Sequence, residues 1–340
     1  MEHRTLGSSG TVVSTYALGT MTFGAETDEE TAHEQLDTFL EAGGTLVDTA
    51  DVYSQGASEE IVGRWLDDRP SDVTDRVVLA TKARFATGED PNEVGLSRRH
   101  LGRALDASLT RLRVDCIDLY QVHAFDPVTP LEETLRFLDD AVRAGKVRYA
   151  GLSNFDGWQV QRAVDVAEHH RLPRPVTLQP QYNLLAREVE WEIVPACLAN
   201  GLGLLPWSPL GGGWLTGKYT RDQRPTGETR LGEDPDRGVE AYDKRSASER
   251  TWAVVDAVQS VAEGRGVPMA QVALSWLHDR PGVCSVVLGA RTTEQLTANL
   301  GAAGLHLGDE ETARLDAASD PAPADYPSGP AGRAQHQRDL

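Results

Sequence analysis

The sequence predicts an α/β protein whose strands close into a (β/α)8 barrel, the TIM-barrel fold. Short apolar runs alternate about eight times with helical segments along the 340 residues. These runs lack a polar face, which is typical of strands buried on both sides of a parallel sheet. An open dinucleotide-binding sheet would carry G-x-G-x-x-G after its first strand. No such motif follows the first run, and the similar GLGLLPW at 201–207 has Pro206 in place of the third glycine.

Three connections between helix and strand repeat one pattern. In 40–50, 142–155 and 198–210, a helical stretch ends at Ala-Gly or Asn-Gly, an apolar run follows, and a polar residue closes the run. A glycine at this point can adopt the left-handed conformation of a helix C-cap. Each connection therefore predicts a helix followed by a buried strand.

The other elements follow from apolar periodicity. Besides the strands in the three connections, strands are predicted within 12–20 and at 77–81, 117–122, 176–179 and 285–288. Helices are predicted at 31–42, 59–66, 98–112, 131–144, 157–169, 190–199, 271–278 and 294–300. Ser58 precedes two glutamates and an apolar run, a pattern that indicates a helix N-cap.

Two regions interrupt the alternation. Residues 220–248 are rich in Arg, Asp, Gly and Pro without an apolar period, and we expect a long loop there, followed by an extra helix at 249–263. Residues 318–340 form a polar tail rich in Pro and Gly, which we expect to lie over the barrel mouth. The whole chain, 1–340, is predicted to form a single domain.

Composition limits the classes of partner. The net charge of −19, from 33 basic and 52 acidic residues, argues against broad binding of nucleic acid or anionic lipid. The N-terminus has no apolar signal core, no apolar run reaches transmembrane length, and the three cysteines form no C-x-x-C motif. These features predict a cytoplasmic protein without a metal site, and the preference for Arg over Lys is typical of bacteria with GC-rich genomes.

Ionisable residues follow three of the early predicted strands. Asp48, Lys82 and His123 lie at strand ends, and Tyr53 follows Asp48 closely. Each alone has an ordinary structural explanation, such as an ion pair, a cap or a packing contact. Because the C-terminal strand ends of a barrel share one mouth, we expect these four side chains to meet there. Burying Lys and Asp together is costly, and a shifted pKa is a gain that would justify the cost at a functional site.

This set suggests general acid catalysis. The ammonium of Lys82 beside Tyr53 would lower the pKa of the phenol, which is about 10 in water. Asp48 would keep Lys82 charged, and His123 would hold a substrate oxygen, so that Tyr53 could protonate a carbonyl oxygen during reduction. Asp51 is interpreted only as a residue that shapes or caps the turn.

The order Asp48–Tyr53–Lys82–His123 and its flanking motifs resemble the aldo-keto reductase superfamily over nearly the whole chain. The matching motifs are VDTADVYSQGASEEIVGRWL, GLSNF and VVLGARTTEQLTANLGA. WSPLGGGWLTGKY is more similar to the bacterial and channel β-subunit-like branches. The resemblance implies a barrel that binds NADPH and reduces a small-molecule aldehyde or ketone, with Tyr53 as proton donor.

The resemblance also implies the cofactor contacts. Ser153, Asn154 and Gln179 would hold the nicotinamide carboxamide, Trp207 would stack on the ring, and Arg291 would bind the 2′-phosphate. The full implied set is Gly19, Thr20, Met21, Asp48, Ser153, Asn154, Gln179, Trp207, Ser208, Leu210, Gly212, Lys218, Gly289, Arg291, Gln295 and Asn299. Many relatives have Lys at the position of Gly289 and Arg at that of Gln295, so NADPH is favoured over NADH chiefly through Arg291 and Lys218.

Two other functions fit part of the pattern. One is a regulatory protein of the channel β-subunit type, which senses NADP(H) and turns over slowly. The other is a lyase or isomerase that uses Lys82 as a Schiff base. The substrate is not predicted beyond its carbonyl group, and a homo-oligomer is compatible with the resemblance. An apolar pocket wall is expected from Phe85, Phe125, Trp214 and Tyr326.

Overall fold

Eight parallel strands form the centre of the computed structural model, which describes residues 1–221, 223–227, 229–236, 238–321, 327–329 and 335. The strand order is β10-β3-β4-β5-β6-β7-β8-β9. Leu204 donates to the Gly282 carbonyl at 2.8 Å and accepts from Cys284 at 2.9 Å, which closes the sheet into a barrel. The predicted fold class is thus confirmed. The strands are β3 (Tyr16–Gly19), β4 (Leu46–Asp48), β5 (Val78–Ala83), β6 (Ile117–Val122), β7 (Val147–Ser153), β8 (Thr177–Gln179), β9 (Gly203–Leu204) and β10 (Val286–Leu288).

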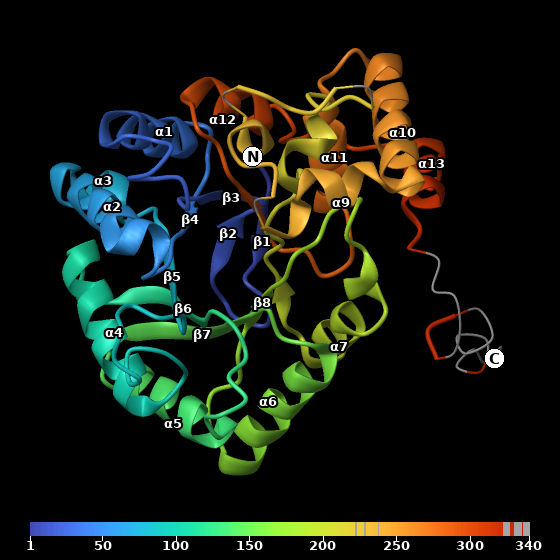
Figure 1. Ribbon diagram of the computed structural model, residues 1–340. Helices are drawn as coiled ribbons and strands as arrows, with labels where there is room; N and C mark the ends of the chain where they lie inside the picture. Colours follow the sequence, from blue (N-terminus) through green and yellow to red (C-terminus); the bar gives the residue numbers. More distant parts are fainter. Residues whose placement is uncertain (222, 228, 237, 322–326, 330–334, 336–340) are drawn as a thin grey trace.

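Helices surround the strands in the order of the chain (Figure 1). Their apolar faces pack on the outer side of the sheet, as the predicted periodicity requires. α4 begins and ends at the predicted residues, and the other predicted helices are present with boundaries shifted by a few residues. They are α1 (Glu29–Glu41), α2 (Ala57–Asp68), α4 (Arg98–Leu112), α5 (Leu131–Arg143), α6 (Gly157–His170), α7 (Ile193–Asn200), α11 (Met269–His278) and α12 (Thr293–Leu300), with a short α3 (Ser71–Thr74) after α2.

The predicted N-cap at Ser58 is wrong. The 3-10 turn η1 (Tyr53–Gly56) leads directly into α2, and Gly56 is the N-cap residue, with φ of 95°. Ser58 therefore lies in the first turn of the helix and faces the barrel, where its hydroxyl donates to the Thr20 carbonyl at 2.8 Å. A serine before acidic residues fits a cap in sequence, but the preceding turn moves the helix start upstream.

The region 220–248 contains short helices that its composition does not predict. They are α8 (Arg230–Glu233), the 3-10 turn η4 (Gly238–Glu240) and α9 (Tyr242–Ser246). Leu231 and Tyr242 are buried and attach this region to the barrel core. Scattered anchors of this kind leave no periodic signal in the sequence.

In the described part of the chain, two helices of more than ten residues lie outside the ring of eight. α10 (Glu249–Arg265) is the predicted extra helix, and α13 (Asp309–Ser319), which sequence reasoning did not predict, lies beside it (Figure 1). Most of the predicted tail, 318–340, lies outside the described residues, and so does its expected position over the mouth.

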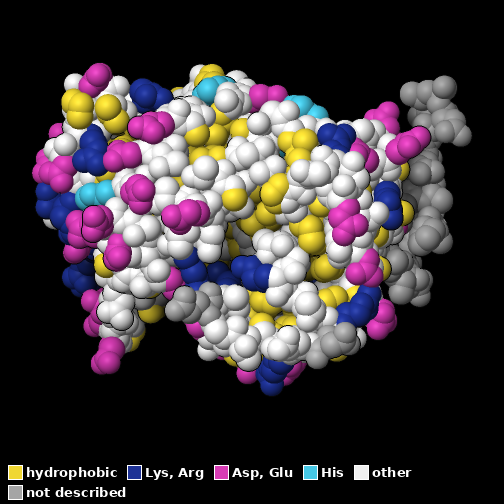
Figure 2. Space-filling model, turned by 90° about the horizontal axis from the view of Figure 1, so that it is seen from above, with side chains coloured by type: hydrophobic (Ala, Val, Ile, Leu, Met, Phe, Trp, Pro, Cys, Tyr) yellow, Lys and Arg dark blue, Asp and Glu magenta, His cyan; other side chains and the backbone are white. Residues whose placement is uncertain are grey.

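Charged side chains of both signs are scattered over the face that Figure 2 shows, with acidic ones between basic ones rather than in a continuous basic patch. This distribution agrees with the strong negative net charge. Among the residues that the structure describes, no helix combines the length and the apolar character that crossing a bilayer demands.

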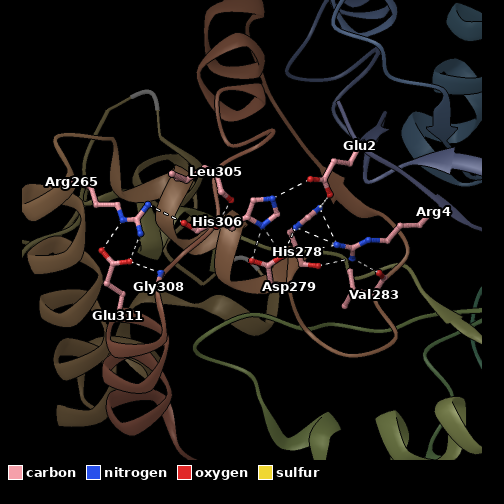
Figure 3. Close-up of polar contacts among 11 residues, drawn as sticks. Glu2, Arg4, Arg265, His278, Asp279, Val283, Leu305, His306, Gly308 and Glu311 are labelled. Carbon is pink, nitrogen blue, oxygen red and sulfur yellow. Dashed lines mark hydrogen bonds and ion pairs between the residues drawn. The ribbon is translucent and has the colours of Figure 1, made fainter.

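An N-terminal hairpin closes the end of the barrel opposite the mouth. Strands β1 (His3–Thr5) and β2 (Val12–Ser14) pair antiparallel, and Leu6 and Val13 pack into the barrel interior. Arg4 donates to the carbonyls of His278 and Val283, both at 2.7 Å (Figure 3). The hairpin therefore fills the end of the barrel with apolar side chains, and hydrogen bonds from Arg4 attach it there.

A polar network at the plug alternates imidazole and carboxylate groups. His306 lies between Glu2, at 3.0 Å, and Asp279, at 3.2 Å, while His278 contacts Asp279 at 2.8 Å (Figure 3). His278, Asp279 and His306 could each offer a ligand atom to a metal. However, the guanidinium of Arg4 lies 3.2 Å from His278 Nε2, and a fixed cation there opposes a metal ion. The cluster is better described as a network of hydrogen bonds and ion pairs that attaches the hairpin to the barrel.

Candidate active site

A cavity of about 710 Å³ opens at the C-terminal ends of the strands. Its size suits an organic ligand, and its wall combines apolar side chains with a few polar groups. Two predicted residues, Thr20 and Lys82, do not line the cavity, because both are fully buried. The predicted residues that line the cavity are Gly19, Met21, Asp48, Tyr53, His123, Ser153, Asn154, Gln179, Trp207, Ser208, Leu210, Gly212, Lys218, Gly289, Arg291, Gln295 and Asn299.

The predicted ionisable residues Asp48, Tyr53 and Lys82 lie in direct contact. Asp48 ends β4, and Lys82 lies inside β5, which runs beyond its predicted end. The ammonium of Lys82 donates to Asp48 Oδ2 at 2.7 Å, to the Thr49 carbonyl at 2.7 Å and to Tyr53 Oη at 3.2 Å. All three hydrogens of the ammonium therefore have an acceptor, which fixes its position beneath the phenol.

A second pair of donors holds the other oxygen of Asp48. Gln179 Nε2 and Gln121 Nε2 donate to Asp48 Oδ1 at 2.9 and 3.1 Å. Gln179, which was predicted as a carboxamide ligand, lines the cavity and also uses one amide N–H to hold Asp48. Sequence reasoning missed Gln121, although it lies two residues before His123 and pairs with Lys82 across the strands. The alternation of side chains along β6 was the signal that could have found it.

Burial affects the pKa of the Tyr53 phenol more strongly than the charge of Lys82 does. Burial raises the pKa of Tyr53, Lys82 lowers it, and the net pKa lies above its ordinary value of 10. This corrects the expectation of a lowered pKa for Tyr53. Burial also opposes the charge on Lys82, but Asp48 and Tyr53 outweigh it and raise the pKa of the amine. At neutral pH, Lys82 is a cation beside a protonated phenol.

His123 is a neutral imidazole in the cavity wall. Burial, together with the positive charges of Lys82 and Arg84, lowers its pKa to about 2. Its ring lies edge-on to Tyr53, with centroids 5.9 Å apart, and to Phe85, with centroids 4.7 Å apart. Its Nδ1 has no hydrogen-bond partner among the described residues. A neutral imidazole has one N–H, which can donate to an oxygen placed beside Tyr53.

Hydrogen bonds order the next part of the wall. Asn154 has φ of 54°, and its Nδ2 donates to the His123 carbonyl at 2.9 Å. Trp207 Nε1 donates to Asn154 Oδ1 at 3.0 Å, and Ser153 Oγ donates to the Gln179 carbonyl at 2.9 Å. The indole of Trp207 is therefore held at the cavity through its N–H, with its ring available for stacking.

A glycine turn borders the cavity next to Lys218. Gly211, Gly212 and Gly213 have φ of 57°, 65° and 99°, a left-handed run that residues with a Cβ rarely adopt. Lys218 packs against this turn, since a Cβ on Gly213 would come within 2.8 Å of Lys218 Cε. The N–H groups of Gly211 and Gly213 donate to the Ser208 and Leu210 carbonyls, both at 3.0 Å, so the group of this turn that suits a phosphate is the ammonium of Lys218 beside it.

Arg291 lies in an ion pair at the far end of the cavity. Its Nη1 and Nη2 donate to the two carboxylate oxygens of Glu233, both at 2.8 Å, and Glu26 lies 3.7 Å away. Gln295 Oε1 accepts from the backbone N–H of Arg291 at 3.0 Å. Sequence reasoning missed both glutamates, because they come from segments distant in the chain from Arg291 and neither belongs to a motif.

Asp51 lies in the turn after β4, where it was interpreted as a residue that shapes or caps the turn. It is 3 % exposed, and neither carboxylate oxygen makes a hydrogen bond with a described residue, so its side chain caps nothing there. Burial and the nearby Glu59 raise the pKa of Asp51 to about 7.

Trp214 was expected in the pocket wall, but it is fully buried and stacks on Tyr242 in the core. Of the other expected wall residues, Phe85 lines the cavity, Phe125 packs on Phe155, and Tyr326 lies outside the described residues.

The residues of this cavity fit a nicotinamide dinucleotide. A flat indole lies at one end, a glycine turn with an amine lies along one wall, and a guanidinium lies at the other end. These are the groups that bind an aromatic ring, a pyrophosphate and a terminal phosphate. The acid set of Asp48, Lys82 and Tyr53 lies at the same end as Trp207 and Asn154.

Comparison with known proteins gives one consistent result. Residues 16–320 match the model of the aldo/keto reductase family. The chain is 36% identical over 324 residues to an uncharacterized oxidoreductase, YrpG, of Bacillus subtilis, covering 93% of this chain and 94% of the relative. It is 35% identical to versiconal hemiacetal acetate reductase of Aspergillus parasiticus, covering 93% and 96%. It is 37% identical to a probable voltage-gated potassium channel β subunit of rice, covering 88% and 90%.

Proposed function

The chain belongs to the aldo/keto reductase family of oxidoreductases, and we propose that it is an NADPH-dependent reductase of aldehydes or ketones with Tyr53 as general acid. One observation carries the proposal. Tyr53 Oη is 3.2 Å from the ammonium of Lys82, and the phenol faces the same cavity as the neutral imidazole of His123. A protonated phenol and an imidazole N–H beside one cavity can together bind the oxygen of a carbonyl group.

Because its pKa is raised, Tyr53 keeps its proton until negative charge develops on the substrate oxygen. A bound reduced nicotinamide dinucleotide would supply the hydride for the carbonyl carbon. As negative charge builds on the carbonyl oxygen, the Tyr53 O–H donates its proton to that oxygen, which gives the alcohol. The tyrosinate that remains lies beside the Lys82 cation, and this contact stabilises it until solvent returns a proton. Asp48 neutralises Lys82 and keeps the ammonium pointed at the phenol.

Other residues of the cavity would hold the dinucleotide. Trp207 would stack on the nicotinamide ring, with Ser153 and Asn154 beside the carboxamide. Lys218, beside the glycine turn, would neutralise the pyrophosphate. Arg291 would bind the adenosine 2′-phosphate through two parallel hydrogen bonds, the feature that supports NADPH over NADH.

The test uses the purified protein with NADPH and a panel of small aldehydes and ketones. We expect loss of the nicotinamide absorbance with at least one of them. Tyr53→Phe should reduce kcat by at least about 100-fold, because only the proton donor is removed. The Kd of NADPH, followed by tryptophan fluorescence, should stay within about twofold of wild type. A Tyr53→Phe protein that turns over normally would refute the acid assignment.

The relatives favour one second candidate. Probable potassium channel β subunits of rice and Arabidopsis thaliana are 37% and 36% identical to this chain, so a protein that senses NADP(H) and docks on a partner deserves a test. The two functions differ in turnover. A sensor would bind NADPH, reduce every carbonyl of the panel slowly, and co-purify with a partner protein, whereas a reductase would show saturable turnover of at least one compound.

A further inference from the structure

The ion pair between Arg291 and Glu233 joins two segments across the end of the cavity. Arg291 lies between β10 and α12, and Glu233 is the last residue of the four-residue helix α8. Both N–H···O distances are 2.8 Å, so the pair is bidentate. Thr229 and Arg230, at the start of α8, line the same cavity as Arg291. The carboxylate is therefore held at the part of the wall where the family resemblance implies phosphate binding.

The two partners differ in how firmly they are held. Hydrogen bonds fix the backbone of Arg291 on both sides, because its N–H donates to Gln295 Oε1 at 3.0 Å and its carbonyl accepts from Thr27 Oγ1 at 3.1 Å. The side chain of Arg291 is 19% exposed, whereas that of Glu233 is 45% exposed on a short helix. The backbone N–H of Glu233 also donates, to the Thr229 carbonyl at 3.0 Å, so the difference lies in the side chains: the more exposed carboxylate is the group that can turn away from the guanidinium.

We propose that Glu233 occupies the position on Arg291 that the 2′-phosphate of NADPH would take, so that Glu233 determines how strongly the protein prefers NADPH to NADH. This inference rests on the proposed function, which places a dinucleotide in the cavity. A carboxylate and a phosphate both offer two oxygens to the guanidinium fork, so they compete for it. NADPH must displace the carboxylate, whereas NADH, with a hydroxyl at the 2′ position, leaves the pair intact.

The surroundings of Arg291 strengthen this competition. Glu26 lies 3.7 Å from the guanidinium, so a second carboxylate already offsets its charge. Gly289 and Gln295 contribute no positive charge to this part of the wall. The phosphate therefore gains less here than it would at an unpaired arginine.

The test is a binding experiment with Glu233→Gln, which keeps the side-chain size and removes the charge. Calorimetry gives the Kd of NADPH, NADH, 2′,5′-ADP and ADP for wild type and variant. We expect Glu233→Gln to tighten NADPH and 2′,5′-ADP by about two- to fivefold, the range of a partly exposed ion pair. The Kd of NADH and ADP should change by less than about 1.5-fold.

Two further variants make the result specific. Asp236→Asn removes one negative charge from the same segment and should leave the ratio of NADPH to NADH affinity unchanged. In an Arg291→Ala background, Glu233→Gln should no longer tighten NADPH, because the effect acts through the guanidinium. Equal tightening of NADPH and NADH, or an effect that persists without Arg291, would overturn the proposal. A wild type that binds neither dinucleotide would instead refute the proposed function.

Discussion

The two ends of the cavity hold their charges in opposite ways. At one end, Asp48 and Lys82 are almost completely buried and make hydrogen bonds with Tyr53, Gln121 and Gln179. At the other end, Arg291 and Glu233 are partly exposed and lie on loops and a short helix. Buried charges interact strongly and cannot exchange partners, whereas exposed ones interact weakly and can. The first end is suited to a fixed chemical step and the second to exchange of an anion.

Removing the buried cation should have the largest effect. Lys82→Met keeps the length of the side chain and leaves Asp48 as an unpaired charge that is 2 % exposed. We expect the free energy of unfolding in urea to fall by about 3–5 kcal/mol. Turnover of NADPH should fall by about 10²–10⁴-fold, because the tyrosinate loses its cation.

A double variant separates the two effects of this change. Asp48→Asn combined with Lys82→Met removes both charges and should recover most of the lost stability without recovering turnover. If Lys82→Met alone unfolds at the urea concentration of the wild type, the strong coupling at the buried end is refuted.

Asp51 should make stability depend on pH. Its pKa is about 7 in the folded protein and about 4 in an unfolded chain, so folding favours the protonated carboxyl. Between pH 4 and 7 the unfolded chain releases this proton first, and the folded state loses stability as pH rises. Asp51→Asn removes the penalty, so its advantage over wild type should grow from near zero at pH 4 to as much as about 4 kcal/mol at pH 8. Urea unfolding at both pH values tests this, and an advantage independent of pH would contradict it.

Gln121 should have a smaller effect on the same end. Gln121→Leu removes one of the two donors to Asp48 Oδ1 and should cost about 1.5–3 kcal/mol in the free energy of unfolding. We expect kcat to fall by about tenfold while the Kd of NADPH stays unchanged.

Gln35 offers a matched control for this substitution. It is also fully buried, but its amide atoms have no hydrogen-bond partner among the described residues. Gln35→Leu should therefore be neutral or stabilising in the same urea experiment. Equal losses of stability in the two variants would show that the contact with Asp48 contributes nothing.

The smallest expected effect is that of salt, which should weaken binding at the exposed end and leave the chemical step at the buried end unchanged. Raising NaCl from about 50 to 500 mM shortens the screening length to a few ångströms. The Kd of NADPH should rise by about two- to fivefold more than that of NADH, because only NADPH carries the 2′-phosphate. The kcat at saturating NADPH should change by less than about twofold, since the buried charges are not screened. A kcat that falls as steeply as the affinity would refute the contrast between the ends.

Features that depend on residues close together in the sequence were predicted, whereas contacts between distant segments were not. The barrel and most of its helices were predicted, because apolar periodicity and glycine caps are local features of the chain. Asp48, Lys82 and His123 were placed together because parallel strands end at a common mouth. Gln121 was missed although its strand face was predictable, and Glu233 could not be found because no motif links it to Arg291. The sign of the pKa shift of Tyr53 was wrong, since it depends on how deeply the phenol is buried.

The order of strands and helices, and the kinds of side chain that reach the barrel mouth, were determined by the sequence alone. Those features depend on residue type and spacing, which are visible along a single chain. Only the tertiary structure decided the partners of each charge: two amides on Asp48, a glutamate on Arg291, and no hydrogen-bond donor among the described residues for Asp51. Electrostatic energy depends on distance and burial in three dimensions, and neither quantity is written in the order of the residues.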